Sequence, residues 1–172
     1  MAPQLNDVVI APTSENDLLE MKRLHARIFG PGRFARTAYR IREGHPLISR
    51  FCHTAKLNGR LVASVTLTPV IIGNKADALL LGPLAVSSAH ANIGIGRKLI
   101  KKSLAAAKAE GIRLVVLVGE LAYYKRVGFT RVPYGHITFP GPADPMRILS
   151  CALDNTALDD YRGLIRAVKH ND

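Results

Sequence analysis

The chain has 172 residues, 48% of them hydrophobic, and its 24 Lys or Arg residues against 13 Asp or Glu give a formal net charge of +11. This length and composition suit one domain with one core, so we treat residues 1–172 as a single domain. No apolar run approaches the ~18 residues of a membrane span, and the chain does not begin like a signal peptide, so we expect a soluble, cytoplasmic protein without membrane contact.

The first third of the chain is predicted to form a short strand and two helices. Val8 to Ala11 reads as a strand, and Ser14 to Asp17 has a capping-box signature that opens a helix reaching roughly to Phe29. The apolar face of this helix is predicted to contain Leu18, Met21, Leu24 and Ile28. Gly30-Pro31-Gly32 ends the helix, and a second short helix is expected from Ala35 to Arg42.

Positive charge is concentrated between Lys22 and Arg60, where ten Lys or Arg residues and one acidic residue, Glu43, leave +9. Such a balance favours anionic partners. The alternative is that these side chains only solvate helix faces, since no aromatic residues alternate with the charges as in a nucleic-acid stacking platform. The charge pattern leaves both interpretations open.

The middle of the chain has the pattern of strands. Ser49 to Leu57 and Leu61 to Ile72 flank Asn58-Gly59, which is typical of a tight hairpin turn because both residues tolerate positive φ. Ala78 to Val86 is a third, continuously apolar strand that contains Gly82-Pro83. Proline lacks the N–H that a strand ladder needs, and glycine favours a bulge. We therefore expect this strand to separate from a neighbour there and leave a gap in which a ligand can bind.

A glycine turn joins that strand to a basic helix. Ala91 to Gly96 reads Ala-Asn-Ile-Gly-Ile-Gly. A loop that leaves a strand and opens a helix presents unpaired N–H groups at the positive end of the helix dipole, so the ligand should contain phosphate. The apolar face of the helix is predicted to contain Ile95, Leu99, Ile100, Leu104 and Ala107. Arg113 to Val118 is the next strand, which predicts a right-handed crossover and a parallel strand pair.

The last part of the chain mixes short elements. Glu120 to Val127 reads as a short helix that Gly128 and Phe129 end. Strands are expected at Ile137 to Phe139 and at Arg147 to Leu153, and a closing helix from Leu158 to Val168.

The side chains that usually identify metal or thiol chemistry are not grouped. Cys52 and Cys151 lie in segments that read as strands, far apart and without a catalytic signature, so we expect two reduced core thiols and no disulfide. The six histidines are scattered, and no cluster has the spacing of metal ligands. We expect no metal site.

The sequence also lacks the residues that two common phosphate-binding motifs require. A Rossmann site needs a third glycine where Leu99 stands and an acidic residue about twenty positions further on, where Leu114 to Leu117 are apolar. A P-loop needs Gly-Lys followed by Ser or Thr, whereas the chain has Gly96-Arg97-Lys98. The glycine turn therefore needs a different explanation.

The segment from Leu79 to Phe129 resembles the GNAT superfamily of N-acetyltransferases. The family's acetyl-CoA loop has the pattern Gln/Arg-x-x-Gly-x-Gly/Ala, which Ala91 to Gly96 matches except at its first residue. Because this loop holds pyrophosphate through backbone N–H groups, alanine there leaves those groups in place. A second family pattern, Tyr-x-x-x-Gly-Phe, is present from Tyr124 to Phe129. The resemblance rests on the ordered set of bulged strand, glycine loop, helix, strand and Tyr-Gly-Phe.

The resemblance implies an α/β (α+β) fold: a mixed, twisted, mostly antiparallel sheet with a splayed parallel strand pair and helices on both faces. It also implies acetyl-CoA as the acetyl donor cosubstrate, with its pantetheine arm in the gap and its pyrophosphate on the glycine loop. The positions implied for binding it are Leu84, Ala85, Val86, Asn92, Ile93, Gly94, Ile95, Gly96, Arg97 and Lys98.

The implied reaction is direct acetyl transfer to a primary amine, which requires no cysteine nucleophile. Tyr124 matches the family's usual general acid, because a phenol with a pKa of about 10 is protonated at neutral pH and can protonate a departing thiolate. Glu120 is the first candidate for the general base, Glu43 and His45 are alternatives, and water can also serve. No residue pattern identifies the acceptor.

The resemblance also bears on the partners. The early helices of this fold usually frame the acceptor pocket, so the basic segment predicts an amine acceptor that is itself acidic. The alternative function is a GNAT-like domain that binds acyl-CoA, or nucleic acid through its basic face, without catalysis. A homodimer is compatible with the sequence, which does not specify the number of subunits.

Overall fold

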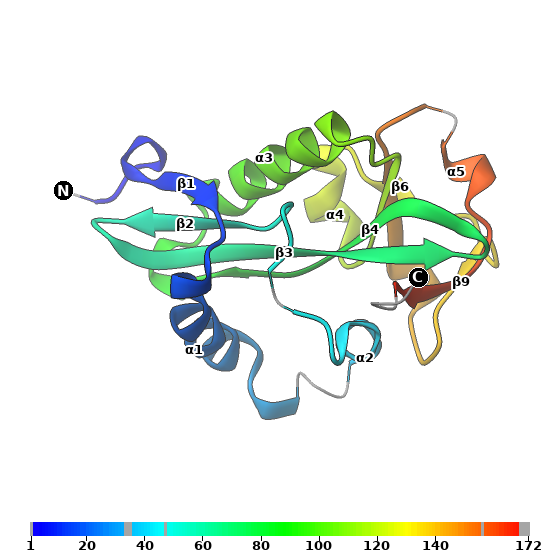
Figure 1. Cartoon of the computed structure of the whole chain (residues 1–172). Coiled ribbons are helices and arrows are strands. Elements are labelled where there is room, and N and C mark those ends of the chain that lie inside the picture. Colours follow the sequence, from blue (N-terminus) through cyan, green and yellow to red (C-terminus); the bar gives the residue numbers. More distant parts are fainter. Residues whose placement is uncertain (1, 33–35, 47, 156, 169–172) are drawn as a thin grey trace.

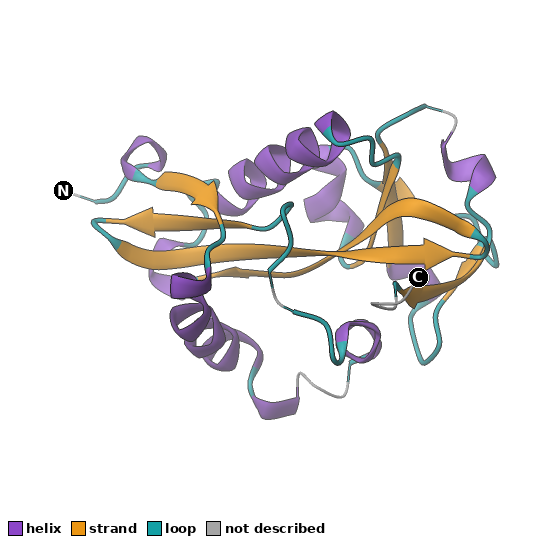
Figure 2. Cartoon of the chain, in the orientation of Figure 1, coloured by secondary structure: helices purple, strands orange, loops and turns teal. Residues whose placement is uncertain are grey.

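The computed structural model describes residues 2–32, 36–46, 48–155 and 157–168. Within them a mixed sheet has helices on both faces (Figures 1 and 2). The strands are β1 Val9–Pro12, β2 His53–Leu57, β3 Arg60–Ile72, β4 Lys75–Val86, β5 Leu114–Val118, β6 Thr130–Arg131, β7 Ile137–Thr138, β8 Ile148–Ala152 and β9 Gly163–Ala167. The α-helices are α1 Leu18–Phe29, α2 Thr37–Arg42, α3 Ile95–Ala109, α4 Leu121–Tyr124 and α5 Ala157–Asp160.

The strand order explains the mixed character of the sheet. Neighbouring strands run β1-β2-β3-β4-β5-β8-β6, and β9 pairs with both β3 and β7. The pairs β4–β5 and β7–β9 are parallel, and the other pairs are antiparallel. The predicted mixed, mostly antiparallel sheet is therefore confirmed. Among the described residues, no helix has the length and apolar character needed to cross a membrane.

The two longest helices cover opposite faces of the sheet. Figure 1 shows α3 and α4 on one face and α1 and α2 on the other. The predicted apolar face of α3 is confirmed, since its five residues are buried in the largest core cluster. On α1, Met21 and Leu24 are fully buried against Leu61 and Ala85.

The apolar face predicted for α1 is wrong at its end. Ile28 is 39% exposed, whereas His25 is buried with its Nε2 atom 3.2 Å from the hydroxyl oxygen of Ser64. The last turn of α1 packs instead through Phe29, which lies partly buried beside the same cluster. A hydrogen-bonded histidine thus occupies an inward position that hydrophobicity alone assigned to isoleucine.

Local turn chemistry behaves as the sequence predicts. Asn58 and Gly59 have φ angles of 51° and 79° and join β2 to β3. Ser14 and Asp17 form the expected capping box ahead of α1, in which the Asp17 carboxylate accepts a hydrogen bond from the Ser14 N–H at 2.9 Å. Cys52 precedes β2 rather than lying in it, and both cysteines are buried and free.

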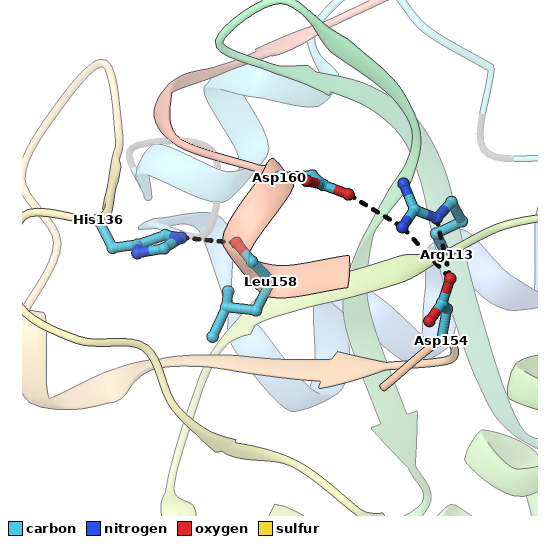
Figure 3. Close-up of polar contacts among 5 residues, drawn as sticks. All are labelled: Arg113, His136, Asp154, Leu158 and Asp160. Atoms are coloured by element: carbon cyan, nitrogen blue, oxygen red, sulfur yellow. Dashed lines mark hydrogen bonds and ion pairs between the residues drawn. The ribbon is translucent and has the colours of Figure 1, made fainter. Parts of the chain in front are cut away.

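The predicted closing helix is wrong. After the short α5, the chain forms β9, whose residues pair with Val70 to Ile72 of β3. Figure 3 shows how α5 is held: the Arg113 guanidinium lies 3.2 Å from the carboxylate of Asp154 and 3.0 Å from that of Asp160. His136 Nε2 donates to the carbonyl oxygen of Leu158 at 2.7 Å. These contacts connect α5 to Arg113, which precedes β5, and to His136, which precedes β7.

The separation predicted at Gly82-Pro83 is confirmed. Strands β4 and β5 pair only where Ala78–Leu80 faces Leu114–Val116. Beyond that point β4 stays with β3, while β5 continues along β8. Alternate N–H and C=O groups on the free side of β4 therefore have no strand partner there.

The bulge changes which side chains of β4 face α3. Val65 of β3 pairs with Leu84 and Leu67 pairs with Leu81, so β4 has one extra residue between these pairs. Before the bulge, Leu81 packs in the core cluster beneath α3, and after it Leu84 packs against the same cluster. Ala85 faces the opposite way, toward α1.

Candidate active site

Two cavities lie along β4 beyond the point where it separates from β5. The first has a volume of about 620 Å³ and the second about 520 Å³. Leu84 and Tyr123 line both, so the cavities meet at these two side chains. The first extends toward α2 and the loop before β8, and the second toward the glycine turn.

The glycine turn forms one wall of the second cavity. Asn92 and Gly94 adopt φ angles of 65° and 93°, and α3 begins at the next residue, Ile95. The Lys98 N–H donates to the Gly94 carbonyl at 3.1 Å, so the first N–H groups of the helix precede this bond and face its open end. Arg97 adds a cation here, because its Nη2 atom is 3.7 Å from the position of a β-carbon on Gly94. This end of α3 suits an anion.

Gly96 is required by a neighbouring side chain. A β-carbon at this position would overlap the Tyr123 hydroxyl, and it would lie 3.5 Å from both Leu84 and Val86. The second glycine of the turn thus allows Tyr123 to pack directly on the first turn of α3. Burial raises the pKa of Tyr123, with Arg97 acting in the opposite direction.

Seven of the ten predicted CoA-binding residues line the second cavity: Leu84, Val86, Asn92, Gly94, Ile95, Gly96 and Arg97. The other three do not line it. Ala85 faces α1, Ile93 packs against the core, and Lys98 is exposed on α3. Four further lining residues, His90, Ala91, Tyr123 and Arg126, were not in the predicted set. Arg126 lies inside the Tyr-Gly-Phe motif, which was the one signal that could have indicated it.

Tyr124 lines the first cavity and is held tightly by its neighbours. Its ring packs on Gly119, where a β-carbon would lie 2.6 Å from Cε2. It also makes edge contacts with Tyr123 at 4.9 Å and Phe129 at 5.8 Å between ring centroids. Burial, followed by the neighbouring Tyr123, raises the pKa of Tyr124 to about 12, although Arg147 acts against this shift. The phenol is therefore protonated at neutral pH.

The candidate bases occupy different places. Glu120 precedes α4, lines the first cavity and lies 3.2 Å from Arg147 Nε, with 74% of its side chain exposed. Glu43 and His45 line neither of the two cavities. The structure thus brings Glu120 and Tyr124 to one cavity wall and leaves the other two candidates outside.

The remaining wall of the first cavity is rich in arginine. Arg36 and Arg42 come from the α2 region, and Arg147 from the loop before β8. The acidic residues on this wall are Glu120, which pairs with Arg147, and Asp144, which accepts a hydrogen bond from the Met146 N–H at 2.9 Å. Neither is placed to neutralise the arginines of α2 within 4.0 Å.

Neither cysteine lines either cavity. Burial raises the pKa of the Cys151 thiol, which keeps it protonated. In the described part of the chain, no three His, Cys, Asp or Glu side chains form a group that could hold a metal ion.

Comparison with known proteins agrees with this geometry. The profile of the acetyltransferase (GNAT) family matches residues 18–129. The chain is 25% identical over 120 residues to the uncharacterized N-acetyltransferase YjhQ of Escherichia coli K12, an alignment that covers 68% of this chain and 66% of that protein. The chain thus spans about two thirds of the length of this relative.

Two solved structures are similar in fold. The E. coli GNAT family N-acetyltransferase YhbS in complex with CoA has a TM-score of 0.82 and 23% identity, covering 99% of this chain and 94% of that one. A GNAT family acetyltransferase from Brucella melitensis in complex with acetyl-CoA has a TM-score of 0.61 and 27% identity, covering 83% of this chain and 94% of that one. The family match includes the separated strands, the glycine turn and the Tyr-Gly-Phe segment, and the chain therefore belongs to the acetyltransferase (GNAT) family.

Proposed function

We propose that this protein is an acetyl-CoA-dependent N-acetyltransferase that moves the acetyl group directly to a primary amine. The observation that supports this best is the meeting of the two cavities at Leu84 and Tyr123. One cavity has the features of a phosphate site, and the other holds a buried, protonated phenol. A thioester placed at the junction would have its phosphates on one side and an amine acceptor on the other.

The second cavity fits the phosphate-containing part of acetyl-CoA. It combines the N-terminus of a 15-residue helix with the guanidinium groups of Arg97 and Arg126. Backbone N–H groups at the start of α3 would bind the pyrophosphate, and the helix dipole adds to the attraction. Because backbone N–H groups make these contacts, the loop does not need a Gln or Arg side chain at its first position, where this chain has Ala91.

The free side of β4 would bind the pantetheine arm. Past Leu80 this edge has lost β5 as a partner, so its N–H and C=O groups are available to an extended amide chain, as in strand addition. An N–H in this segment can also stabilise the oxyanion of the tetrahedral intermediate, a contribution of about 3 kcal/mol for a well-placed donor.

Tyr124 would act as the general acid. When the thiolate of CoA leaves, it needs a proton, and burial keeps the proton on Tyr124 at neutral pH. Packing against Gly119 and Phe129 fixes the ring, so the hydroxyl does not have to be positioned anew in each cycle.

Glu120 is the residue we propose as general base. It lines the same cavity as Tyr124, and its exposure gives a route for the proton to solvent. Glu120→Gln should lower kcat/KM by about tenfold or more if the carboxylate takes the proton of the amine. Glu43→Gln is the matched comparison and should change kcat/KM by less than about twofold. Equal effects of the two substitutions would favour water as the base.

The proposed function is tested by thiol release from acetyl-CoA across a panel of primary amines, with mass spectrometry of the products. Transfer predicts amine-dependent release and an acetylated amine. A domain that only binds acyl-CoA predicts CoA binding without amine-dependent release. Salt-sensitive binding of RNA or DNA, without release, would support the nucleic-acid-binding alternative.

A further inference from the structure

Arg42 is a charged residue that lies almost completely buried. Its side chain is only 7% exposed, although arginine is rarely this buried without a partner. Its guanidinium stacks on the ring of Tyr39, 4.4 Å from the ring centroid, and its Nη1 atom is buried without a hydrogen-bond acceptor. The ion pairs among the described residues do not include Arg42, so none of their carboxylates lies within 4.0 Å of its guanidinium nitrogens.

The position of Arg42 directs it toward the reaction site. It lines the first cavity, and its Nη1 atom would lie 3.5 Å from a β-carbon on Gly82. Gly82 belongs to the bulge at which β4 leaves β5. The unsatisfied donor therefore stands on the α2 side of the gap, in the same cavity as Tyr124.

A buried cation without a partner is costly, and proteins seldom retain one without a use. The cavity around Arg42 does not supply the missing charge. Glu120 is paired with Arg147, and Asp144 caps the turn at Met146. Arg36 adds a further, exposed cation stacked on Phe29 at 5.5 Å. This wall thus has an excess of positive charge, which disfavours a purely cationic amine.

We propose that the acceptor is a small primary amine that also bears a carboxylate, and that Arg42 binds this carboxylate. The inference rests on the proposed acetyl transfer and specifies the substrate class of that same cavity. A guanidinium matches a carboxylate in charge and in fork geometry. A phosphate dianion would need two cations, but Arg36 is exposed, whereas Arg42 is buried.

The experiment compares acids with their neutral analogues. Common α-amino acids, β-alanine and γ-aminobutyrate are each paired with the corresponding amide, and phosphoethanolamine is paired with ethanolamine. Thiol release gives kcat/KM, and isothermal titration gives the affinity of each compound for the CoA-saturated protein. Because the amine of an amino amide loses its proton more easily, intrinsic reactivity opposes the expected preference.

For the best substrate, the acid should exceed its amide by about thirtyfold or more in kcat/KM, the usual effect of a desolvated ion pair. Arg42→Gln should reduce this ratio to about twofold or less, with the KM of acetyl-CoA unchanged, whereas Arg42→Lys should retain part of it. Arg40→Gln is the matched control, because it removes the same charge from the exposed side of the same helix. It should leave the ratio unchanged.

The outcomes separate this inference from the proposed function. Equal use of acids and amides, with thiol release intact, overturns the inference and leaves the transferase. Arg42-dependent binding of carboxylates without thiol release upholds the inference and overturns the transferase. Preference for phosphoethanolamine, or no acid binding at all, also overturns the inference. Circular dichroism of each variant shows whether a loss reflects unfolding, and Arg42→Lys decides the question if Arg42→Gln does not fold.

Discussion

The Tyr123 hydroxyl occupies the space that a β-carbon on Gly96 would fill. This contact joins the residue just before the Tyr-Gly-Phe segment to the glycine turn, which is far away in the sequence. It also places Tyr123 where both cavities meet. The geometry of the proposed phosphate site therefore depends on a residue of the neighbouring helix.

Gly96→Ala should weaken CoA binding by about tenfold, or ~1.4 kcal/mol, because the methyl group must displace Tyr123 from the start of α3. Isothermal titration of CoA measures this loss. Tyr123→Phe removes the overlapping oxygen, so the double variant should recover most of the affinity. Gly32→Ala is the control, since its β-carbon would meet nothing within 4 Å. Additive losses in the double variant would contradict the proposed contact.

Tyr124→Phe should lower turnover by about 10²- to 10³-fold, because it removes the proton donor while keeping the ring between Gly119 and Phe129. The KM for acetyl-CoA should change little. Steady-state kinetics with the best amine measures both quantities. Tyr134→Phe changes a hydroxyl on a side chain that is 89% exposed and should have no effect. Full turnover in Tyr124→Phe would remove Tyr124 from the mechanism.

The pH dependence of turnover follows from the raised pKa of Tyr124. A general acid works only while protonated, so the loss of activity due to Tyr124 should occur near its pKa of about 12. Turnover should therefore rise with pH as the amine loses its proton, and it should not fall between about pH 8 and pH 10. A pH–rate profile tests this. A decline near pH 10 that disappears in Tyr124→Phe would show that burial does not hold the proton.

Arg42→Met should make the free protein more stable by about 1–3 kcal/mol, because a side chain of similar length replaces a buried cation that has no carboxylate partner among the described residues. Burial lowers the pKa of Arg42 to about 10, with Tyr39 and Cys52 acting in the opposite direction. A lowered pKa means that the folded state disfavours the charged form. The cost is therefore fully present below about pH 10 and declines as pH rises above it.

Urea unfolding at neutral pH measures the free energy difference for Arg42→Met. Arg40→Met removes an exposed arginine from the same helix and should shift the free energy of unfolding by less than about 0.5 kcal/mol. With CoA already at saturation, adding the preferred amino acid should stabilise the wild type further and leave the stability of Arg42→Met unchanged. A clear loss of stability in Arg42→Met would mean that the guanidinium already has a stabilising partner.

Much of the fold was predictable because its signals are local. The Asn58-Gly59 turn and the periodic apolar face of α3 depend on neighbouring residues alone, and both are confirmed. The segment from Leu158 to Val168 was mistaken for a helix because a short apolar run does not reveal its period. Its true partner is β3, nearly a hundred positions earlier in the chain, and sequence spacing gives no information on that contact.

The site also combines residues that local motifs predict with residues that only long-range packing identifies. The glycine turn and Tyr124 stand in recognisable motifs, so the positions that line the second cavity were mostly predictable. Arg42 was one of ten cations in a basic segment, and only the packing of α2 against the bulge distinguishes it from Arg40 two residues earlier. Net charge indicated an anionic acceptor without identifying the residue that would bind it.

The extra residue in β4 has a consequence for how this strand can vary. Loss of one residue at Gly82-Pro83 would remove the bulge, so that successive side chains of β4 alternate strictly between the two faces of the sheet. Each side chain after this point would then lie on the opposite face from the one it occupies now. Ala85 would then stand beside the glycine turn, and Leu84 and Val86 would face α1, where the small Ala85 now packs in the cluster of Met21 and Leu24. The number of residues in β4, independently of their identity, is therefore a condition for the proposed binding of the acetyl donor.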